Sequence, residues 1–420
     1  MIKTNNLLNK TAHATLKAHD ALKGVTIHTP LEYSERLSRL YKAEVFLKRE
    51  DLQPVRSYKI RGAYTLLSSL SPQERVNGVV CASAGNHAQG VAYSCRELGI
   101  RGTIFMPETT PRQKVDRVHF FGDKWVDIQL VGKTYDESNT AALVFRDRNQ
   151  AVYAPPFDDF RTIAGQGTVA KEILEDEPEV DVVVHPIGGG GLIAGCGAYF
   201  AINAPKVKVV GAEPAGALGM LRSLEAGRVV TLKDIDPFVD GAAVKKVGNK
   251  TFAIAKKVIS NIVSVPEGAV CTTMIELYQK EGIIAEPAGA LAVSALKELA
   301  PNICGKRVVA VVSGGNNDIS RYPEVIERSL VYQGLKHYFI VEFFQKPGEL
   351  KTFVTEALGS GDDITRFEYI KKINKEKGPA LVGIELSRKE DLKPLLGRMD
   401  KLGIRYKHFT TDDLLYSVLL

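Results

Sequence analysis

The chain has 420 residues, more than one domain of ordinary size, and its apolar content of 45% is enough for large cores. Its 55 basic and 49 acidic residues give a net charge of +6 that is spread along the chain, which argues against nucleic-acid or membrane-surface binding. The five cysteines show no metal-ligand spacing, and there is neither a signal sequence nor an apolar run of about 20 residues, so we expect a cytoplasmic protein with reduced thiols.

Short apolar runs alternate with helical patterns from about residue 77. We predict strands at 78–82, 102–106, 125–131 and 152–154, with helices at 87–98, 111–121 and 136–148 between them. A second series has a helix at 168–174, a strand at 182–186, a helix at 192–201, and strands at 208–212 and 308–312. This alternation is typical of α/β lobes built on parallel sheets with helices on both faces. We expect residues 1–334 to form one catalytic module, in which a smaller lobe of about 55–155 is inserted in a larger one.

The pattern changes after about Gly334. We predict strands at 338–344, 364–373, 380–386 and 406–409, and helices at 348–358 and 389–402. The order strand, helix, strand, strand, helix, strand is that of a ferredoxin-like α+β domain. We therefore expect a separate C-terminal domain at 335–420.

Three loop motifs in the first module carry chemistry. Lys59 lies in the segment 57–63 (Ser-Tyr-Lys-Ile-Arg-Gly-Ala) between Arg56 and Arg61. A lysine in such a run is commonly a surface cation, but nearby cations favour the neutral, nucleophilic amine, and the residues after it have the pattern of a buried helix.

The second motif, 83–87 (Ser-Ala-Gly-Asn-His), links a predicted buried strand to a predicted helix. The free N–H groups of such a helix start bind anions, and a substrate carboxylate is a natural ligand. Ser83 or Asn86 as a simple helix cap is an equally good interpretation of this segment alone.

The third motif is the run of four glycines at 188–191, followed by Leu192. Four glycines weaken any regular element unless the backbone must approach a group closely, and a phosphate at the next helix start is such a group. Glu213, about 20 residues on, also makes the segment similar to a dinucleotide fingerprint, so this segment alone leaves NAD and an isolated phosphate open.

A lysine, polar orienting side chains and a phosphate cradle together are what a pyridoxal-phosphate enzyme requires. These motifs, with 286–289 (Glu-Pro-Ala-Gly) and 313–316 (Ser-Gly-Gly-Asn), resemble the fold-type II pyridoxal-phosphate enzymes, which share the tryptophan synthase β-like fold, and among them the threonine dehydratases (threonine ammonia-lyases). The segment 346–350 (Lys-Pro-Gly-Glu-Leu) makes the C-terminal part similar to the single ACT-like regulatory domain of the short biosynthetic forms. The resemblance covers almost the whole chain.

The resemblance implies a role for each motif. Lys59 would form the Schiff base with pyridoxal 5'-phosphate and take the substrate Cα proton. Asn86 would bind the pyridoxal 3-oxygen, Ser313 would face the ring nitrogen, and the glycine loop would hold the phosphate. The cofactor-binding set would be Lys59, Asn86, Gly188, Gly189, Gly190, Gly191, Leu192 and Ser313. The substrate-binding set would be Ser83, Gly85, Asn86, His87 and Glu286.

Two of these roles stay open on the sequence. Glu286 could equally cap the helix that follows it. A related branch, the serine racemases, binds a divalent cation through two acids and a carbonyl after the glycine loop. This chain has Glu213 and Ala217, but Gly219 stands where the second acid would be. We therefore predict no metal site, although a monovalent ion stays open.

The resemblance implies conversion of L-threonine to 2-oxobutanoate and ammonia through an enamine, as the first committed step of isoleucine biosynthesis, with L-serine as a secondary substrate. It further implies a homotetramer inhibited by isoleucine, with valine as a possible antagonist, whereas a tail that only assembles subunits is the simpler alternative. Rival functions are a catabolic threonine/serine dehydratase, a serine racemase, a non-catalytic amino-acid sensor and an NAD-dependent oxidoreductase. The last would leave Lys59, Asn86 and Ser313 without a role.

Overall fold

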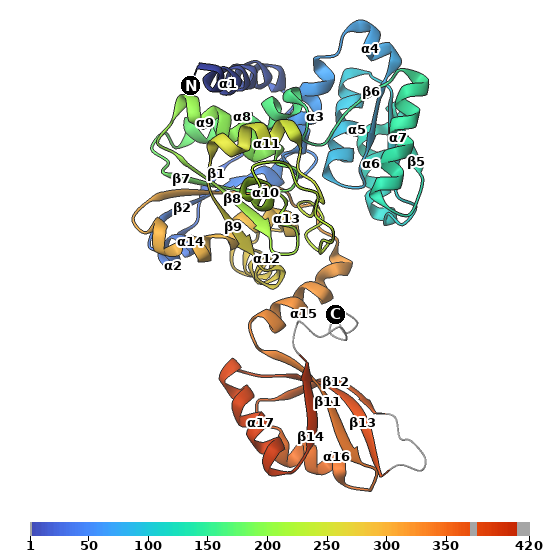
Figure 1. Cartoon of the computed structure of the whole chain (residues 1–420), viewed down its shortest axis with the longest axis vertical. Helices are drawn as coiled ribbons and strands as arrows, with labels where there is room; N and C mark the ends of the chain where they lie inside the picture. The colour runs from blue at the N-terminus through green and yellow to red at the C-terminus, as the bar shows by residue number, and fades with distance from the viewer. Residues whose placement is uncertain (1, 370–375, 410–420) are drawn as a thin grey trace. The chain divides into compact units, whose positions relative to one another are not determined.

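The computed structural model describes residues 2–369 and 376–409, whose helices and strands Figure 1 shows. Contacts divide the chain into two compact units, residues 1–267 with 276–317, and residues 268–275 with 318–420. The first unit has the expected α/β architecture, with two lobes, and the second has the expected ferredoxin-like topology. Among the described residues, no helix has the length and apolar character that crossing a membrane requires.

The smaller lobe is built on a parallel sheet in the order β5-β4-β3-β6. Val79 and Cys81 of β3 face a core with α3, α5 and α6, whereas Val80 and Ala82 face α7, so the apolar run is buried on both sides as predicted. Its strands are β3 (Val79–Ala82), β4 (Gly102–Met106), β5 (Val126–Leu130) and β6 (Val152–Tyr153). Its helices are α3 (Lys59–Ser68), α4 (Pro72–Asn77), α5 (Asn86–Leu98), α6 (Arg112–Gly122), η2 (Asp123–Trp125) and α7 (Tyr135–Asn149).

The larger lobe contains a sheet in the order β1-β2-β10-β7-β8-β9. Its strands are β1 (Leu31–Tyr33), β2 (Glu44–Arg49), β7 (Val182–Pro186), β8 (Lys208–Pro214), β9 (Ile259–Val265) and β10 (Arg307–Val312). Its helices are α1 (Ile2–Leu22), α2 (Glu35–Tyr41), η1 (Glu50–Leu52), α8 (Phe160–Asp176), α9 (Gly191–Asn203), α10 (Gly219–Glu225), α11 (Asn249–Val258), α12 (Glu267–Glu281), α13 (Pro287–Ser294) and α14 (Leu296–Ile303). Residues 268–275 of α12 belong to the second unit.

Two features of the larger lobe differ from the sequence prediction. The sheet is mixed, because β1 pairs antiparallel with β2 at its edge; β1, β2 and β9 were not predicted. The helix predicted at 168–174 begins at Phe160, where the side chain of Asp159 accepts a hydrogen bond from the Arg161 amide (2.8 Å) and so caps the helix. Short or partly polar strands such as β1 and β9 lack the continuous apolar run that identified β3 and β7.

Glycines set the distances between the helices that carry the predicted site. A Cβ on Gly165 of α8 would lie 2.5 Å from the carbonyl oxygen of Arg61 in α3. A Cβ on Gly195 of α9 would lie 2.2 Å from the carbonyl oxygen of Ile163 in α8. Because no side chain fits at these crossings, α8 holds the start of α3, at Lys59, and the start of α9, after the glycine loop, in a fixed relation.

The second unit contains an antiparallel sheet in the order β12-β13-β11-β14. Along the chain, helices follow the first and third of these strands, β11 and β13. Its elements are η3 (Ile319–Arg321), α15 (Tyr322–Tyr332), β11 (Lys336–Phe344), α16 (Glu349–Thr352), the π-helical turn η4 (Phe353–Ala357), β12 (Asp363–Tyr369), β13 (Lys377–Glu385), η5 (Lys389–Asp391), α17 (Leu392–Lys401) and β14 (Arg405–Phe409). The helix predicted at 348–358 is thus a short α-helix continued by a π-turn. Residues 370–373 of the predicted strand 364–373 lie outside the described residues.

Candidate active site

Lys59 is the first residue of α3, the helix of the smaller lobe that packs on α8 of the larger lobe. Its side chain is half-buried, and its Nζ donates a hydrogen bond to the carbonyl oxygen of Pro156 (3.2 Å). Loss of hydration lowers the pKa of Lys59 from 10.5 to about 8, although the negative charge of Glu286 acts in the opposite direction. A larger fraction of this amine is therefore neutral near pH 7 than of a lysine in water, as a nucleophile requires.

The turn at 83–87 precedes α5, with Gly85 at the cap position. The Oγ of Ser83 accepts a hydrogen bond from the Gly85 amide (3.3 Å), which uses this side chain within the turn. A Cβ on Gly85 would meet no atom within 4 Å, so open space lies in front of the helix start. The free N–H groups at the start of α5 and this space suit a small anion.

The side chain of His87 points away from that space. Its Nε2 lies 2.8 Å from the carbonyl oxygen of Ala154. Burial, together with the charge of Lys59, lowers the pKa of His87 to about 3, so the ring is neutral and Nε2–H is the donor. His87 can therefore contribute its backbone N–H to an anion, but not a positive charge.

Asn86 lies in a chain of hydrogen bonds with a single direction. Asn316 Nδ2 donates to the carbonyl oxygen of Val55 (2.8 Å) and to Asn86 Oδ1 (2.7 Å), and Asn86 Nδ2 donates to Glu286 Oε1 (2.5 Å). This order fixes the orientation of both amides and leaves one N–H of Asn86 for a ligand. Asn316 was part of a sequence motif, but no role was predicted for it.

Glu286 is buried, and its pKa is raised from 4.5 to about 7, first by burial and then by the charge of Asp240. The hydrogen bond from Asn86 and the charges of Lys114 and Lys59 act in the opposite direction. Glu286 can thus exist in either protonation state near neutral pH, which suits a group that exchanges protons.

We predict that Glu286 weakens the folded state as the pH rises. Between pH 4.5 and about 7 the folded chain holds a proton on Glu286 that the unfolded chain has released, so this contribution to the free energy of unfolding is lost with rising pH. Glu286→Gln should therefore be more stable than the parent at pH 8 and closer to it at pH 5, as measured by urea unfolding of the ligand-free protein. Equal differences at both pH values would contradict a raised pKa.

Ser313 follows β10 and is joined to the lysine segment by backbone contacts. The Tyr58 amide donates to the carbonyl oxygen of Ser313 (3.1 Å), and Ser57 forms a bridge with Gly314. Ser313 Oγ donates to the carbonyl oxygen of Ala288 (3.2 Å). The hydroxyl of Ser57 is fully buried and has no hydrogen-bond partner among the residues that the structure describes, so it is available for a ligand.

The glycine loop connects β7 to α9, and residues outside the loop form hydrogen bonds with its backbone. Gly190 has φ +91° and caps α9, and the Gly189 carbonyl oxygen accepts hydrogen bonds from Thr251 Oγ1 (2.7 Å) and the Gly248 amide (3.2 Å). A Cβ on Gly189 would lie 2.1 Å from the ring of Phe157. Leu192 is buried in the core of the larger lobe and anchors the start of α9. The loop therefore presents backbone N–H groups at a helix start, as a phosphate requires.

Gly189→Ala should weaken phosphate binding, because the new methyl group must displace Phe157 and with it the loop. We expect the Kd for pyridoxal phosphate to rise at least about tenfold, measured by equilibrium dialysis. Gly397→Ala is the control, since a Cβ there meets no atom within 4 Å and should leave the Kd unchanged. An unchanged Kd in Gly189→Ala would remove the loop from the binding site.

Glu213 has a local role that the sequence did not reveal. Its two carboxylate oxygens accept hydrogen bonds from the amides of Met220 (2.7 Å) and Leu221 (2.8 Å) at the start of α10, which begins at Gly219. Burial raises the pKa of Glu213 to about 7, against these two hydrogen bonds. Since both oxygens bind the helix start, the spacing that resembled a dinucleotide fingerprint reflects a helix cap.

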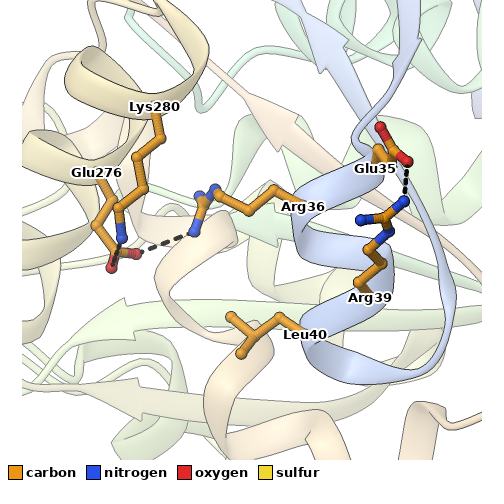
Figure 2. Close-up of a pocket in the computed structure, with 6 residues that line it drawn as sticks. All are labelled: Glu35, Arg36, Arg39, Leu40, Glu276 and Lys280. Atoms are coloured by element: carbon orange, nitrogen blue, oxygen red, sulfur yellow. Dashed lines mark hydrogen bonds and ion pairs between the residues drawn. The ribbon is translucent and has the colours of Figure 1, made fainter.

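The surface hollow shown in Figure 2 lies on the first unit and is lined by residues other than those of the candidate site. Its charged side chains pair with one another, Arg36 with Glu276 and Arg39 with Glu35. It is lined by Glu35, Arg36, Arg39, Leu40, Glu276 and Lys280, none of which belongs to a sequence motif. The chemistry is therefore located by the motif residues and not by this hollow.

The motif residues fit the cofactor that the sequence predicted. Lys59 offers a largely desolvated amine, Ser57 an unpartnered hydroxyl, and Asn86 an oriented amide. A Cβ on Gly314 would lie 2.3 Å from Glu286 Oε1 and 3.3 Å from Asn86 Nδ2, so only a glycine lets these two polar side chains approach the backbone after β10. Together with the glycine loop, these groups match the amine, ring and phosphate requirements of pyridoxal phosphate.

Comparison with known proteins gives the same answer. The profile of the family described as pyridoxal-phosphate dependent enzyme matches residues 23–314, and that of the C-terminal regulatory domain of threonine dehydratase matches residues 327–419. The chain is 52% identical to the biosynthetic L-threonine dehydratase IlvA of Bacillus subtilis, over 100% of this chain and 99% of that protein. It is 53% identical to the protein of the same name from Mycobacterium tuberculosis, over 96% and 95% of the two chains.

Solved structures agree with these relatives. Threonine deaminase isoform 2 of Solanum lycopersicum, in its processed form, has a TM-score of 0.73 and 39% identity, covering 77% of this chain and 88% of that one. Maize serine racemase has a TM-score of 0.71 and 28% identity, covering 76% and 98%. The chain therefore belongs to the pyridoxal-phosphate-dependent enzymes and, within them, to the biosynthetic L-threonine dehydratases, which are threonine ammonia-lyases with a C-terminal regulatory domain.

Proposed function

We propose that this chain converts L-threonine to 2-oxobutanoate and ammonia, as the first committed step of isoleucine biosynthesis, and acts on L-serine as a secondary substrate. The observation that carries the proposal is the position of Lys59, whose desolvated amine starts α3 at the junction of the lobes that also hold Asn86 and Glu286. The substrate is inferred from the relatives, which are biosynthetic L-threonine dehydratases.

In this proposal pyridoxal phosphate, when bound, supplies an electron-accepting ring conjugated to the amino nitrogen of the substrate. Lys59 would hold the cofactor as a Schiff base, Gly188–Leu192 its phosphate, Asn86 its 3-oxygen, and Ser313 would face the ring nitrogen. The directed chain from Asn316 through Asn86 supports an oriented amide at this point.

The proton steps fall to residues of the chain. Once its amine is released, Lys59 Nζ accepts the proton from the substrate Cα. The bond from Cβ to the hydroxyl oxygen breaks, and this oxygen takes up one proton from solvent and leaves as water, which balances the proton taken by Lys59. The released enamine takes up a proton on carbon and is hydrolysed by one water to 2-oxobutanoate and ammonia. Loss of one water and uptake of another leave threonine divided into these two products.

We further propose that the turn 83–87 holds the substrate carboxylate through the N–H groups at the start of α5. The open space at Gly85 supports this position. Gly85→Ala should raise the KM for threonine about tenfold or more, because the methyl group would occupy the carboxylate position, while the unfolding midpoint changes little. Steady-state kinetics with a urea titration test this; an unchanged KM would place the carboxylate elsewhere.

A racemase is separated from a lyase by its products. The likeness to maize serine racemase makes L-serine the informative substrate. We expect pyruvate and ammonia from L-serine without accumulation of D-serine, measured by chiral chromatography over the course of the reaction. D-serine formed faster than pyruvate would favour a racemase instead.

We propose that residues 335–420 form an ACT-like regulatory domain, attached to a catalytic domain of residues 1–334, in a homotetramer. Isoleucine would inhibit by binding the less active of two states more tightly, and valine would oppose it. The family profile over 327–419 supports a regulatory role for this region. Isoleucine titration of the full chain, with and without valine, together with sedimentation velocity, tests the effector and the assembly; a rate independent of isoleucine would leave the region an assembly element.

A further inference from the structure

Besides the buried pairs that Arg61 makes with Glu50 and Glu172, an exposed ion pair joins the two lobes near the candidate site. Lys114 lies on α6 of the smaller lobe, and its Nζ contacts Asp240 Oδ2 of the larger lobe at 2.9 Å. The side chains are 29% and 43% exposed, so the pair faces water at the edge of the site. An ion pair with this exposure adds little to the free energy of unfolding, so stability alone does not explain why it links the two lobes at this point.

Asp240 belongs to a tight turn, residues 239–243. The carbonyl oxygen of Val239 accepts hydrogen bonds from the amides of Ala242 (2.8 Å) and Ala243 (2.7 Å), and Asp240 Oδ1 accepts one from the Gly241 amide (3.0 Å). Asp240 thus ties the turn together with one carboxylate oxygen and binds Lys114 of the other lobe with the second.

This turn lies between the glycine loop and Glu286. A Cβ on Gly188 would be 3.1 Å from Ala242 Cα, so the turn packs directly on the loop. On its other side, a Cβ on Gly241 would lie 2.8 Å from Ala288 Cβ and 3.7 Å from Glu286 Oε1. A shift of the turn would therefore change both the glycine loop and the surroundings of Glu286.

We propose that Lys114 and Asp240 are positioning residues of this active site, whose ion pair joins the two lobes and holds the turn 239–243 against Glu286. This proposal rests on the proposed function, since it assigns to the pair a part in the same reaction. Neither residue belongs to a sequence motif. The contact joins positions 126 residues apart, so the sequence alone shows no sign of it.

The charges around Glu286 give the proposal a distinctive signature. The charges that act on it are those of Asp240 from the turn, Lys114 from α6 and Lys59 from α3, and the amide of Asn86 is its hydrogen-bond donor. Burial, and after it the charge of Glu286, raises the pKa of Tyr58. Removing the positive charge of Lys114 would raise the pKa of Glu286, and removing the negative charge of Asp240 would lower it. A merely structural defect would not produce shifts of opposite sign.

The test compares Lys114→Gln, Asp240→Asn and the double variant as full-length enzyme loaded with pyridoxal phosphate. Arg112→Gln is the matched control, because it removes a positive charge from the same helix, and the partner of Arg112, Asp116, lies on that helix (3.7 Å). Glu286→Gln identifies the limb of the pH–rate profile that belongs to Glu286. The readouts are this profile for 2-oxobutanoate formation and the hydrogen exchange of the amides in 239–243, measured by mass spectrometry without substrate.

The limb of the pH–rate profile that belongs to Glu286 is the one absent in Glu286→Gln. We expect its midpoint to move by about 0.3–1 pH unit, upward in Lys114→Gln and downward in Asp240→Asn. Both shifts should become smaller in high salt. The double variant should lie between them, and the control should match the parent. Exchange at 239–243 should be at least about threefold faster in both single variants, with no further gain in the double variant.

Shifts of the same sign, or unchanged profiles and exchange in an active parent enzyme, would overturn the proposal and leave the proposed function intact. A profile of Glu286→Gln that keeps every limb would overturn it too. A parent enzyme that forms no 2-oxobutanoate would instead sink the proposed function, and hydrogen exchange would still decide whether the pair holds the turn.

Discussion

Lys59→Ala is expected to reduce 2-oxobutanoate formation from L-threonine by about 10³-fold or more, because it removes both the covalent attachment of the cofactor and the base at the substrate Cα. The visible absorbance of the bound cofactor should also be lost or displaced, since no amine remains at this position. Absorbance spectra of the reconstituted protein and initial rates measure the two effects.

A urea titration shows whether the loss of activity in Lys59→Ala comes from the missing amine or from unfolding. Burial costs the ammonium form of Lys59 hydration, as its lowered pKa shows, so the alanine variant should unfold at the same urea concentration or a higher one. Lys280→Ala is the control, because this exposed lysine in the hollow of Figure 2 pairs only with Glu276 among its described ion pairs. A Lys59→Ala enzyme that keeps a tenth of the parent rate would contradict the assignment.

Arg61→Leu is expected to lower the free energy of unfolding of the catalytic unit by about 3–5 kcal/mol. The guanidinium is buried two residues beyond Lys59 and pairs with Glu50 (2.7 Å) and Glu172 (2.6 Å). Lys48 reaches Glu172 from the other side (2.9 Å) and is also buried. Without Arg61, Glu50 would remain buried without its cation, at a cost far above that of an exposed pair.

Urea titration followed by the fluorescence of Trp125, the single tryptophan, reports this unit by itself. Arg61→Lys keeps the charge but loses the planar fork that binds two carboxylates, and should fall between Leu and the parent. Arg39→Leu breaks a pair that is 80% and 70% exposed and should cost less than about 1 kcal/mol. If Arg61→Leu lowers the free energy of unfolding by less than about 1 kcal/mol, the prediction is wrong, and Glu50 and Glu172 find other partners or become hydrated.

The parts of the site that the sequence revealed are those with a local signature. The glycine run at the start of α9 and Lys59 at the start of α3 could be identified from the sequence, because a backbone cradle and a helix start depend on neighbouring residues. The apolar runs of β3, β7 and β10 predicted parallel strands for the same reason, since strands buried on both faces carry apolar side chains at nearly every position.

What the sequence left open depends on contacts between distant positions. Glu213 made the glycine segment similar to a dinucleotide fingerprint, and only the fold shows that its carboxylate binds the amides at the start of α10. His87 was predicted to bind substrate as part of the turn 83–87, and only the fold shows that its ring is directed to the carbonyl oxygen of Ala154, 67 positions away. Asn86 forms hydrogen bonds with Asn316, 230 positions away, and with Glu286, 200 positions away, and no spacing rule could have indicated these contacts.

Product analysis of the purified full-length protein with pyridoxal phosphate and L-threonine decides whether this chain acts as a threonine dehydratase. We expect 2-oxobutanoate and ammonia in equal amounts, at a rate that requires the cofactor and falls when isoleucine is added. A protein that binds the cofactor, as judged by its visible absorbance, but releases neither product from threonine would show that the proposed function is wrong.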